Sequence, residues 1–178
     1  MAFLEKGYKV PKEKGNYYKF QQGDNQFRIV SDAIAGFEYW NTSGKPVRLA
    51  ERPSEIPKDI RFEDDSTYKI KPFMSFVVID REDGAVRIMQ ITQKGIMETI
   101  TALYNNPKWG DPKEYDIVVN RQGEGLDTKY STTPDPKEPL TAEEKSKVSR
   151  MEIDLNKLFA GENPFEQKSE VKIEDVPF

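Results

Sequence analysis

Residues 69–91 read KIKPFMSFVVIDREDGAVRIMQI, and this stretch decides the fold. A nearly continuous apolar run from Phe73 to Ile79 leads into the turn sequence Arg81-Glu-Asp-Gly84, and an alternating segment, 86–91, follows. Asp and Gly between two strand-forming runs are typical of a β-hairpin. The stretch therefore predicts two long antiparallel strands, 69–80 and 86–91.

Further strands are predicted on both sides of this hairpin. Segments 26–31 and 36–42 alternate apolar and polar residues, which indicates two strands upstream. Downstream, segments 115–121 and 126–132 are separated by Gly123-Glu-Gly125 and predict a second hairpin. The polar residues between the upstream strands and the first hairpin predict a long loop.

One helix is predicted between the two hairpins. Apolar residues recur at helical spacing from Ile96 to Tyr104, and Thr92 is the expected N-cap. Four strands, a helix and two more strands indicate a mainly β fold with minor helix, best matched by a small, partly open antiparallel barrel. The oligonucleotide/oligosaccharide-binding (OB) barrel is the best-known example. Other small barrels and an open antiparallel sheet fit the same pattern.

A second helix is predicted near the C-terminus. Pro134, Pro136 and Pro139 indicate a linker, and Thr141-Ala-Glu-Glu144 is a capping box that opens a helix. This helix should continue to Gly161 and bury an apolar stripe against the barrel or a second subunit. The stripe comprises Val148, Met151, Leu155 and Leu158.

The net charge of −4 is distributed unevenly along the chain. The first 19 residues carry five lysines and two glutamates, whereas residues 134–178 carry seven basic and eleven acidic side chains. Such asymmetry indicates contact with a polyanion at one end, and contact with a partner or self-screening at the other. The expected regions are a basic N-terminal arm (1–19), an OB-like barrel (20–133), a proline linker with a packing helix (134–160) and a flexible, disordered acidic tail (161–178).

Composition excludes most catalytic chemistry. The chain has no cysteine and no histidine, which removes disulfides, thiolate nucleophiles, imidazole bases and nearly all zinc sites. The cluster Glu63-Asp64-Asp65 is typical of a solvated turn, and the remaining residues offer no nucleophile–base pair. We expect no catalytic residues, no metal and no cofactor, and therefore no enzyme. No apolar run is long enough to span a membrane, and no signal peptide is apparent.

Aromatic and basic residues interleave in a way that suits single-stranded nucleic acid, which needs flat faces for bases and cations for phosphates. In strand 36–42, Phe37 and Tyr39 share one face and Trp40 lies on the other, so one aromatic set should be core and the other exposed. The sequence leaves open which set is exposed, and the polar neighbours Glu38 and Thr42 favour Trp40. Lys69, Lys71 and Phe73 share one face of their strand. Any one of these rings alone is more often a core residue, but the grouping favours binding. The expected DNA contacts are Trp40, Arg48, Lys69, Lys71, Phe73, Arg87, Arg121, Lys129 and Tyr130.

The last residues suit a docking peptide. Two acids, a proline and a terminal phenylalanine fit a basic groove that contains an apolar slot, although a frayed end has a similar composition. The residues predicted to dock on a partner are Glu174, Asp175, Val176, Pro177 and Phe178.

Three segments resemble single-stranded DNA-binding proteins encoded by bacteriophages: 23–30, 36–48 and 115–130. The resemblance covers most of residues 20–160, and the 174–178 tip is similar to the acidic Pro-Phe tip of bacterial single-stranded DNA-binding proteins. It implies an OB-fold protein that coats single-stranded DNA without sequence preference during DNA replication, recombination or repair. It also implies a tip that docks on replication or recombination proteins and can compete with DNA. The expected location is the cytoplasm of a bacterial host cell, as monomer or dimer.

Two alternatives remain open at the level of sequence. A barrel that binds protein, with the tail tethering an enzyme, fits the electrically neutral body, since many nucleic-acid binders are basic overall. RNA binding uses the same rings and cations as DNA binding. A titration with single-stranded and duplex DNA separates the adaptor from the nucleic-acid binder.

Overall fold

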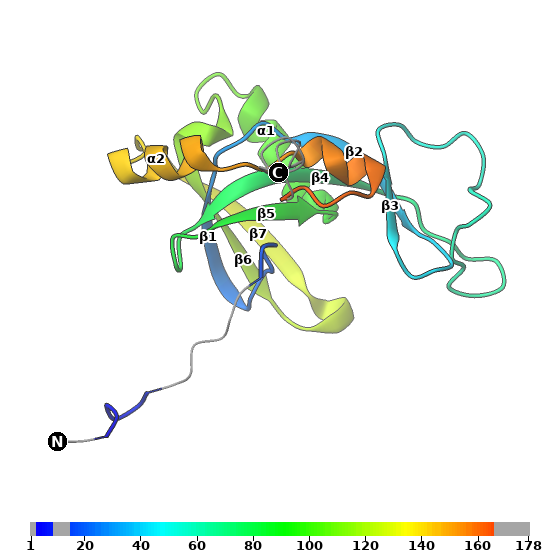
Figure 1. The fold of residues 1–178 in the computed structure, drawn as a ribbon, viewed down its shortest axis with the longest axis horizontal. Coiled ribbons are helices and arrows are strands. Elements are labelled where there is room, and N and C mark those ends of the chain that lie inside the picture. Colours follow the sequence, from blue (N-terminus) through cyan, green and yellow to red (C-terminus); the bar gives the residue numbers. More distant parts are fainter. Residues whose placement is uncertain (1–2, 9–14, 166–178) are drawn as a thin grey trace, which may run out of the picture.

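The computed structural model describes residues 3–8 and 15–165 of the chain. Within this part, seven strands form one antiparallel sheet, and two α-helices and three short 3₁₀ helices lie outside it (Figure 1). The strands are β1 Gly23–Ile29, β2 Ile34–Trp40, β3 Pro46–Leu49, β4 Lys71–Asp80, β5 Val86–Ile91, β6 Tyr115–Gln122 and β7 Lys129–Lys137. The helices are α1 Lys94–Asn105, α2 Ala142–Arg150, and the 3₁₀ helices η1 Pro112–Glu114, η2 Gly125–Asp127 and η3 Leu155–Ala160.

Strand β4 is the centre of the sheet. Along one edge it pairs with β5, from Met74 opposite Ile91 to Ile79 opposite Val86, so the predicted first hairpin is confirmed. Along its other edge it pairs first with β2 and then with β1, which are joined by a short bend at residues 30–33. Because of this bend, the consecutive strands β1 and β2 can both pair with the same edge of β4 in a curved sheet.

The rest of the sheet extends from β1 to β6 and then to β7, giving the order β3-β2-β4-β1-β6-β7 with β5 on the far edge of β4. The mainly antiparallel architecture with a helix between β5 and β6 is therefore confirmed. In the described residues no ladder joins β5 to β7, so the sheet is open and a closed barrel is not formed.

The inner face of the curved sheet holds the main core. Helix α1 covers this core with the buried residues Ile96, Ile100 and Leu103, which lie on one side of the helix. The sheet contributes Phe27, Ile29, Phe76, Val78, Met89, Ile91, Tyr115, Ile117 and Val119. The predicted helix is confirmed, but its N-cap is Gln93 and not Thr92.

A C-terminal layer covers part of the outer face of the sheet. Leu155 and Leu158 are buried against Val77, Ile79 and Ile88 of β4 and β5. The expected burial of this stripe against the body is thus confirmed. The capping box at Thr141 is also present. The Thr141 side chain accepts from the Glu144 backbone N–H, and the Glu144 carboxylate accepts from the Thr141 backbone N–H.

Two predictions about the C-terminal quarter are wrong. The helix does not run from 142 to 160: it ends at Arg150, residues 151–154 are not helical, and the Asp154 side chain caps a separate 3₁₀ turn by accepting from the Asn156 N–H. Pro134 and Pro136 do not form a linker but lie inside β7. An edge strand tolerates proline because its outer N–H groups have no partner strand.

Two projections leave the central sheet in different directions. Figure 1 shows the β2–β3 hairpin and the loop 50–70 at one end of the molecule, and the β6–β7 hairpin pointing elsewhere. Residues 9–14 of the predicted basic arm and residues 166–178 of the predicted tail lie outside the described residues, whereas 161–165 continue from η3 along the body.

Candidate nucleic-acid interface

One face of the β2–β3–β4 region gathers an aromatic ring and two cations. In register, Trp40 lies opposite Pro46, and Glu38 lies opposite both Arg48 and Lys71. Directly opposite residues point their side chains to the same face of a sheet. We call this surface, formed by Glu38, Trp40, Pro46, Arg48 and Lys71, the arm face.

Trp40 is the exposed ring of the arm face, with 44% of its surface accessible, as the alternation with Tyr39 predicts. The Arg61 guanidinium carbon lies 5.7 Å from the centre of the indole, within the range of a cation–π contact. The loop that carries Arg61 is anchored: the Arg61 N–H donates to the Trp40 carbonyl at 2.8 Å, and Ile60 is 2% exposed. The ring is held in place and still offers surface to a ligand.

Arg48 is a fixed cation. Its Nε donates to Gln90 Oε1 at 2.8 Å and lies 3.1 Å from Glu38 Oε2, while Gln90 Nε2 donates to the same Glu38 oxygen at 2.6 Å. These contacts from β2 and β5 orient the guanidinium and leave 15% of the side chain accessible. Lys71 is exposed at the start of β4. Together they place positive charge on either side of β2.

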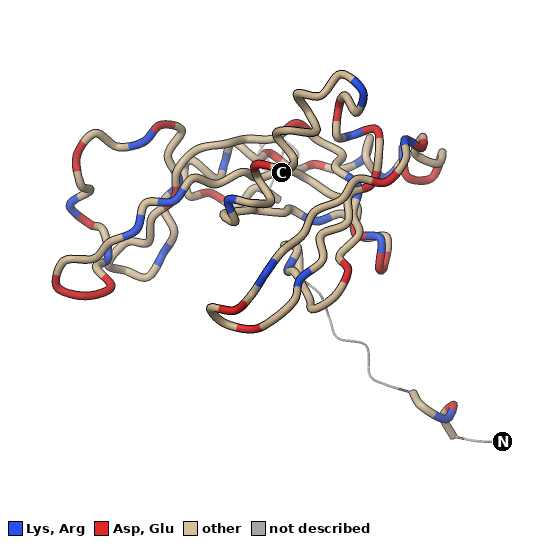
Figure 2. The backbone as a smooth tube through the Cα atoms, turned by 180° about the vertical axis from the view of Figure 1, so that it is seen from behind, with Lys and Arg blue, Asp and Glu red and all other residues tan. Residues whose placement is uncertain are grey.

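Lys69 lies next to the arm face but is paired. Its Nζ is 3.3 Å from Glu63 Oε1, and both side chains are about half exposed. Such a surface pair is weak, so Lys69 can exchange its carboxylate for a phosphate at little cost. Basic residues recur along the whole β2–β3 projection and its loop, interleaved with acidic ones (Figure 2).

A pocket of about 720 Å³ opens beside the arm face. It lies between Tyr17, strand β3 and the C-terminal residues 158–165. The rings of Tyr17 and Phe165 meet edge to face with centroids 5.8 Å apart. Burial raises the pKa of the Tyr17 hydroxyl, and the charge of Arg48, which lines the same pocket, opposes this effect.

Two residues predicted to contact DNA are buried, and the prediction for them is wrong. Phe73 is 1% exposed and packs against Phe159 at 6.0 Å, so its ring has no free face for a base. Arg87 is 5% exposed, and its guanidinium donates to Asp80 at 2.8 Å and to Asp83 at 2.7 and 2.8 Å. Its charge is therefore already neutralised in the interior.

The remaining predicted residues form a separate group on the β6–β7 hairpin. Arg121 lies opposite Tyr130 and donates to the Phe20 carbonyl at 3.0 Å, and the Tyr130 ring is 5.7 Å from that of Phe20. Lys129 is exposed beside them. The structure thus brings together Trp40, Arg48 and Lys71, but not all nine predicted contacts.

Two residues that lie beside the arm face are absent from the predicted DNA contacts. Arg61 lies in a polar loop, 21 positions after the ring that it covers, and Tyr17 comes from the N-terminal segment. The available signal for Arg61 is the neighbouring Ile60, an apolar residue in a mostly polar loop, which indicates an anchored rather than a free segment.

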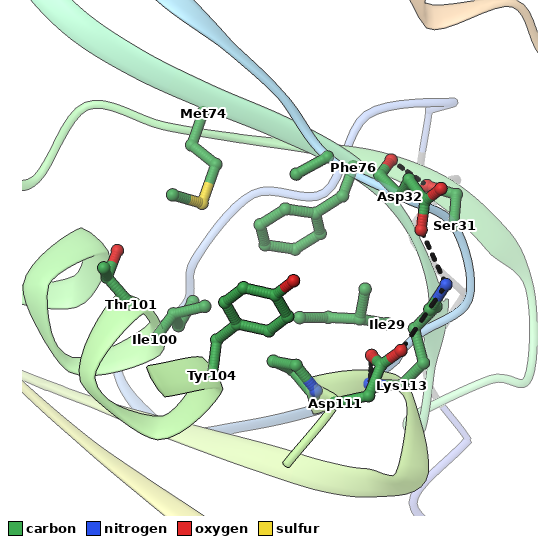
Figure 3. Close-up of a pocket in the computed structure, with 12 residues that line it drawn as sticks. Ile29, Ser31, Asp32, Met74, Phe76, Ile100, Thr101, Tyr104, Asp111 and Lys113 are labelled. Atoms are coloured by element: carbon green, nitrogen blue, oxygen red, sulfur yellow. Dashed lines mark hydrogen bonds and ion pairs between the residues drawn. The ribbon is translucent and has the colours of Figure 1, made fainter. Parts of the chain in front are cut away.

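A different, apolar pocket of about 360 Å³ lies between α1, β4 and the bend after β1 (Figure 3). Phe76 forms part of its floor, and the Tyr104 ring stands at its side (Figure 3). Its lysine, Lys113, is engaged by two carboxylates, with Nζ 2.6 Å from Asp32 and 3.7 Å from Asp111. An apolar interior with a paired cation is poorly suited to phosphate, so this pocket is not the candidate interface.

Among residues 3–8 and 15–165, no group of three or more Asp or Glu side chains is arranged to hold a metal ion. No helix in that same part of the chain has both the length and the apolar character needed to cross a bilayer.

Comparison with known proteins gives one informative likeness. Over 140 residues the chain is 23% identical to a protein of Escherichia phage T5 named "Probable ssDNA-binding protein". The match covers 66% of this chain and 54% of the phage protein, so the chain spans about half the length of that relative. No protein-family model matches the sequence, and no solved structure matches it.

Proposed function

We propose that this protein binds single-stranded DNA across the arm face. The observation that carries the proposal is Trp40, an exposed ring held under Arg61 and flanked by Arg48 and Lys71. Base stacking on such a ring contributes about 1–3 kcal/mol per base, and the cations neutralise phosphates. The likeness to a phage protein named as a probable binder of single-stranded DNA supports the same reading.

The proposed mode of binding is without sequence preference. A ring and cations recognise features that every nucleotide shares, whereas sequence reading needs hydrogen bonds to base edges. The role that follows is coating of single-stranded DNA during phage DNA replication, recombination or repair in the cytoplasm of a bacterial host. We assign no enzymatic activity, since the chain lacks Cys and His and the relative carries the name of a binding protein.

We further propose that the open sheet works as an OB-like barrel closed by segment 15–20. On one side of the gap the Tyr18 N–H donates to the Ile88 carbonyl of β5 at 2.8 Å. On the other side the Phe20 ring lies 5.7 Å from the ring of Tyr130 in β7, and Arg121 of the neighbouring β6 donates to the Phe20 carbonyl at 3.0 Å. The segment therefore bridges the two edges that a closed barrel would pair directly.

The test uses Trp40 as its own reporter. Because Trp109 is the other tryptophan, the Trp109→Phe variant leaves Trp40 as the source of indole fluorescence. Titration with oligothymidylate at low salt should quench this fluorescence, and added salt should reverse the quenching because phosphate contacts release counterions. Unquenched fluorescence, with no binding in a parallel gel shift, contradicts the proposal.

The same titration is repeated with duplex DNA and with RNA to test which nucleic acid the protein prefers. Duplex DNA of equal length should bind more weakly, since its bases are not free to stack, and RNA of the same sequence shows whether the sugar matters. The Trp40→Phe variant is the control: Trp109 packs edge to face on Tyr115 at 5.5 Å, and its fluorescence should not respond. Binding of a replication protein by the body without any nucleic acid would favour the adaptor alternative.

The C-terminal tip, which lies outside the described residues, is proposed as the docking peptide for a replication or recombination protein. Deletion of residues 171–178 should keep or raise DNA affinity, because it removes two acids and one lysine. The same deletion should abolish binding to the replication protein in a pull-down. Phe178→Ala is the finer variant, expected to weaken docking without changing DNA affinity, and intact docking after deletion contradicts this role.

A further inference from the structure

The pocket beside the arm face is built from three distant parts of the chain. Its walls are Asn16 and Tyr17, residues 45–48 around β3, and the C-terminal segment 158–165. The C-terminal segment, orange to red in Figure 1, runs past β2 and β3 after leaving the outer layer. At about 720 Å³ the pocket has the size of a small-ligand site.

The lining of this pocket combines flat apolar surface with positive charge. Tyr17 and Phe165 supply aromatic surface, and Lys45 and Arg48 supply two cations on the β3 side. Among the described residues that line it, Glu162 is the one acid. Apolar rings facing cations are the combination that a nucleotide needs, with its base on the rings and its phosphate on the charges.

Backbone hydrogen bonds hold both rings in place. The residues on either side of Tyr17 bond to β5: the Ile88 N–H donates to the Asn16 carbonyl at 3.0 Å, and the Tyr18 N–H donates to the Ile88 carbonyl at 2.8 Å. On the opposite wall, the Asp154 N–H donates to the Pro164 carbonyl at 3.0 Å, and Pro164 is buried. The Phe165 N–H itself donates to Asn163 Oδ1 at 2.9 Å.

We propose that this pocket takes one nucleotide of the bound strand, with the base against Tyr17 and Phe165 and the phosphate between Lys45 and Arg48. The inference rests on the proposed function and adds a defined subsite to it. Pro46, opposite Trp40 in the β2–β3 ladder, lines the pocket, so a strand that stacks on Trp40 continues into it. The C-terminal segment is then a wall of the binding site and not only a cover for the sheet.

The test removes the aromatic ring of Phe165 from the wall of the pocket. Phe165→Ala should lower affinity for oligothymidylate by about 5- to 150-fold, the factor that corresponds to the stacking energy of one base. The dependence of affinity on salt should stay as in the wild type, because phenylalanine carries no charge. Phe165→Leu keeps apolar packing without an aromatic face, so it should fold normally and still lose affinity.

Phe62→Ala is the matched control. Phe62 also meets a tyrosine edge to face at 5.8 Å, namely Tyr68, but it does not line the pocket. Its removal should change affinity less than two-fold. Equal losses for Phe62→Ala and Phe165→Leu, or wild-type affinity for Phe165→Leu, would overturn the subsite.

Two further probes distinguish a nucleotide within a bound strand from a free nucleotide as the ligand of this pocket. An abasic oligonucleotide should bind wild type and Phe165→Leu equally, since it carries phosphates but no base to stack. Free thymidine monophosphate should compete only weakly with the strand, because it lacks the neighbouring contacts on the arm face. Competition as strong as that of an oligonucleotide would assign the pocket to a free nucleotide and overturn the proposal.

The outcomes distinguish this inference from the function on which it rests. If wild-type protein fails to bind oligothymidylate, the proposed function itself fails. If wild type binds and Trp40→Ala weakens binding while Phe165→Leu does not, the arm face stands and the subsite alone is refuted.

Discussion

The β4–β5 turn region and the β2–β3 projection both carry arginines, but these arginines differ in how accessible they are. Around the turn, Arg28 and Arg87 are 2% and 5% exposed and bond to carboxylates. On the projection, Arg61 lies over an exposed indole, and Arg48, although paired with Glu38 at 3.1 Å, keeps 15% of its side chain accessible beside a pocket. The number of cations in a segment therefore does not locate a binding surface; what each cation already contacts does.

The turn region is held by one carboxylate at the centre of a network. Asp116 of β6 accepts from Arg28 Nε at 2.7 Å and from Arg81 Nε at 2.9 Å. Arg81 also bonds to Glu144 of α2. Burial alone would raise the pKa of Asp116, but hydrogen bonds from Arg81, Gln26 and Arg28 outweigh it and lower that pKa. The network joins β1, β6, the hairpin turn and the C-terminal layer.

The largest expected effect comes from removing this central charge. Asp116→Asn leaves the buried guanidinium of Arg28 without its counter-ion, and breaking such a pair costs about 3–5 kcal/mol of folding stability. Chemical denaturation measures the loss. Single-stranded DNA affinity of the folded variant should be unchanged, because Asp116 is remote from the arm face in the sheet order.

Asp32→Asn is the control for that variant. Asp32 also pairs with a cation, Lys113 at 2.6 Å, but its side chain is 92% exposed. Exposed ion pairs contribute about 0–1 kcal/mol. Comparable losses for the two variants would mean that burial does not separate the two kinds of pair.

A smaller effect is expected for Trp40→Ala, which changes the β2–β3 projection. Loss of one stacking ring should weaken binding of oligothymidylate by about 1–3 kcal/mol. Folding stability should change by less than about 1 kcal/mol, since the ring is largely exposed and its contact with Arg61 is a surface cation–π pair. Anisotropy titration and thermal unfolding measure the two quantities. An unstable variant with normal affinity would reverse the roles assigned to the two regions.

Acid should weaken the turn region selectively. The lowered pKa of Asp116 means that the carboxylate stabilises the fold at neutral pH. That stabilisation is lost as the pH falls below about 4 and through the folded-state pKa. Glu144 acts in the same direction: burial raises its pKa, but bonds from Thr141 and Arg81 lower it overall. Denaturation from pH 7 to pH 2 should therefore show a steeper loss in wild type than in Asp116→Asn.

The smallest effect is expected for a single exposed cation of the arm face. Lys71→Ala should reduce the slope of log affinity against log salt by about 1, because one phosphate contact disappears. Lys94→Ala is the control, since Lys94 is exposed on α1 and outside the arm face. Equal changes in slope for the two variants would show that the protein's general charge, and not this surface, sets the salt dependence.

Local sequence patterns were enough to predict six of the seven described strands, the first hairpin and the capping box at Thr141, but the short strand β3 was not predicted. Each depends on neighbours within a few residues, such as the alternation that exposes Trp40. The same reasoning failed for Phe73, because its face of β4 is covered by Phe159 from a segment more than eighty positions away. It also failed for Arg87, whose carboxylate partners come with the folded turn.

The sequence by itself determined that the chain is a mainly antiparallel β protein without Cys or His and with an exposed ring among cations. Periodicity, turn residues and composition are local properties, and they are visible without coordinates. Tertiary structure decided which cations are available: it buried Arg87, placed Arg61 over Trp40, and brought Phe165 against Tyr17 beside Arg48. The contacts of Arg61 with Trp40 and of Phe165 with Tyr17 join residues 21 and 148 positions apart, and such pairings follow from packing of the whole chain.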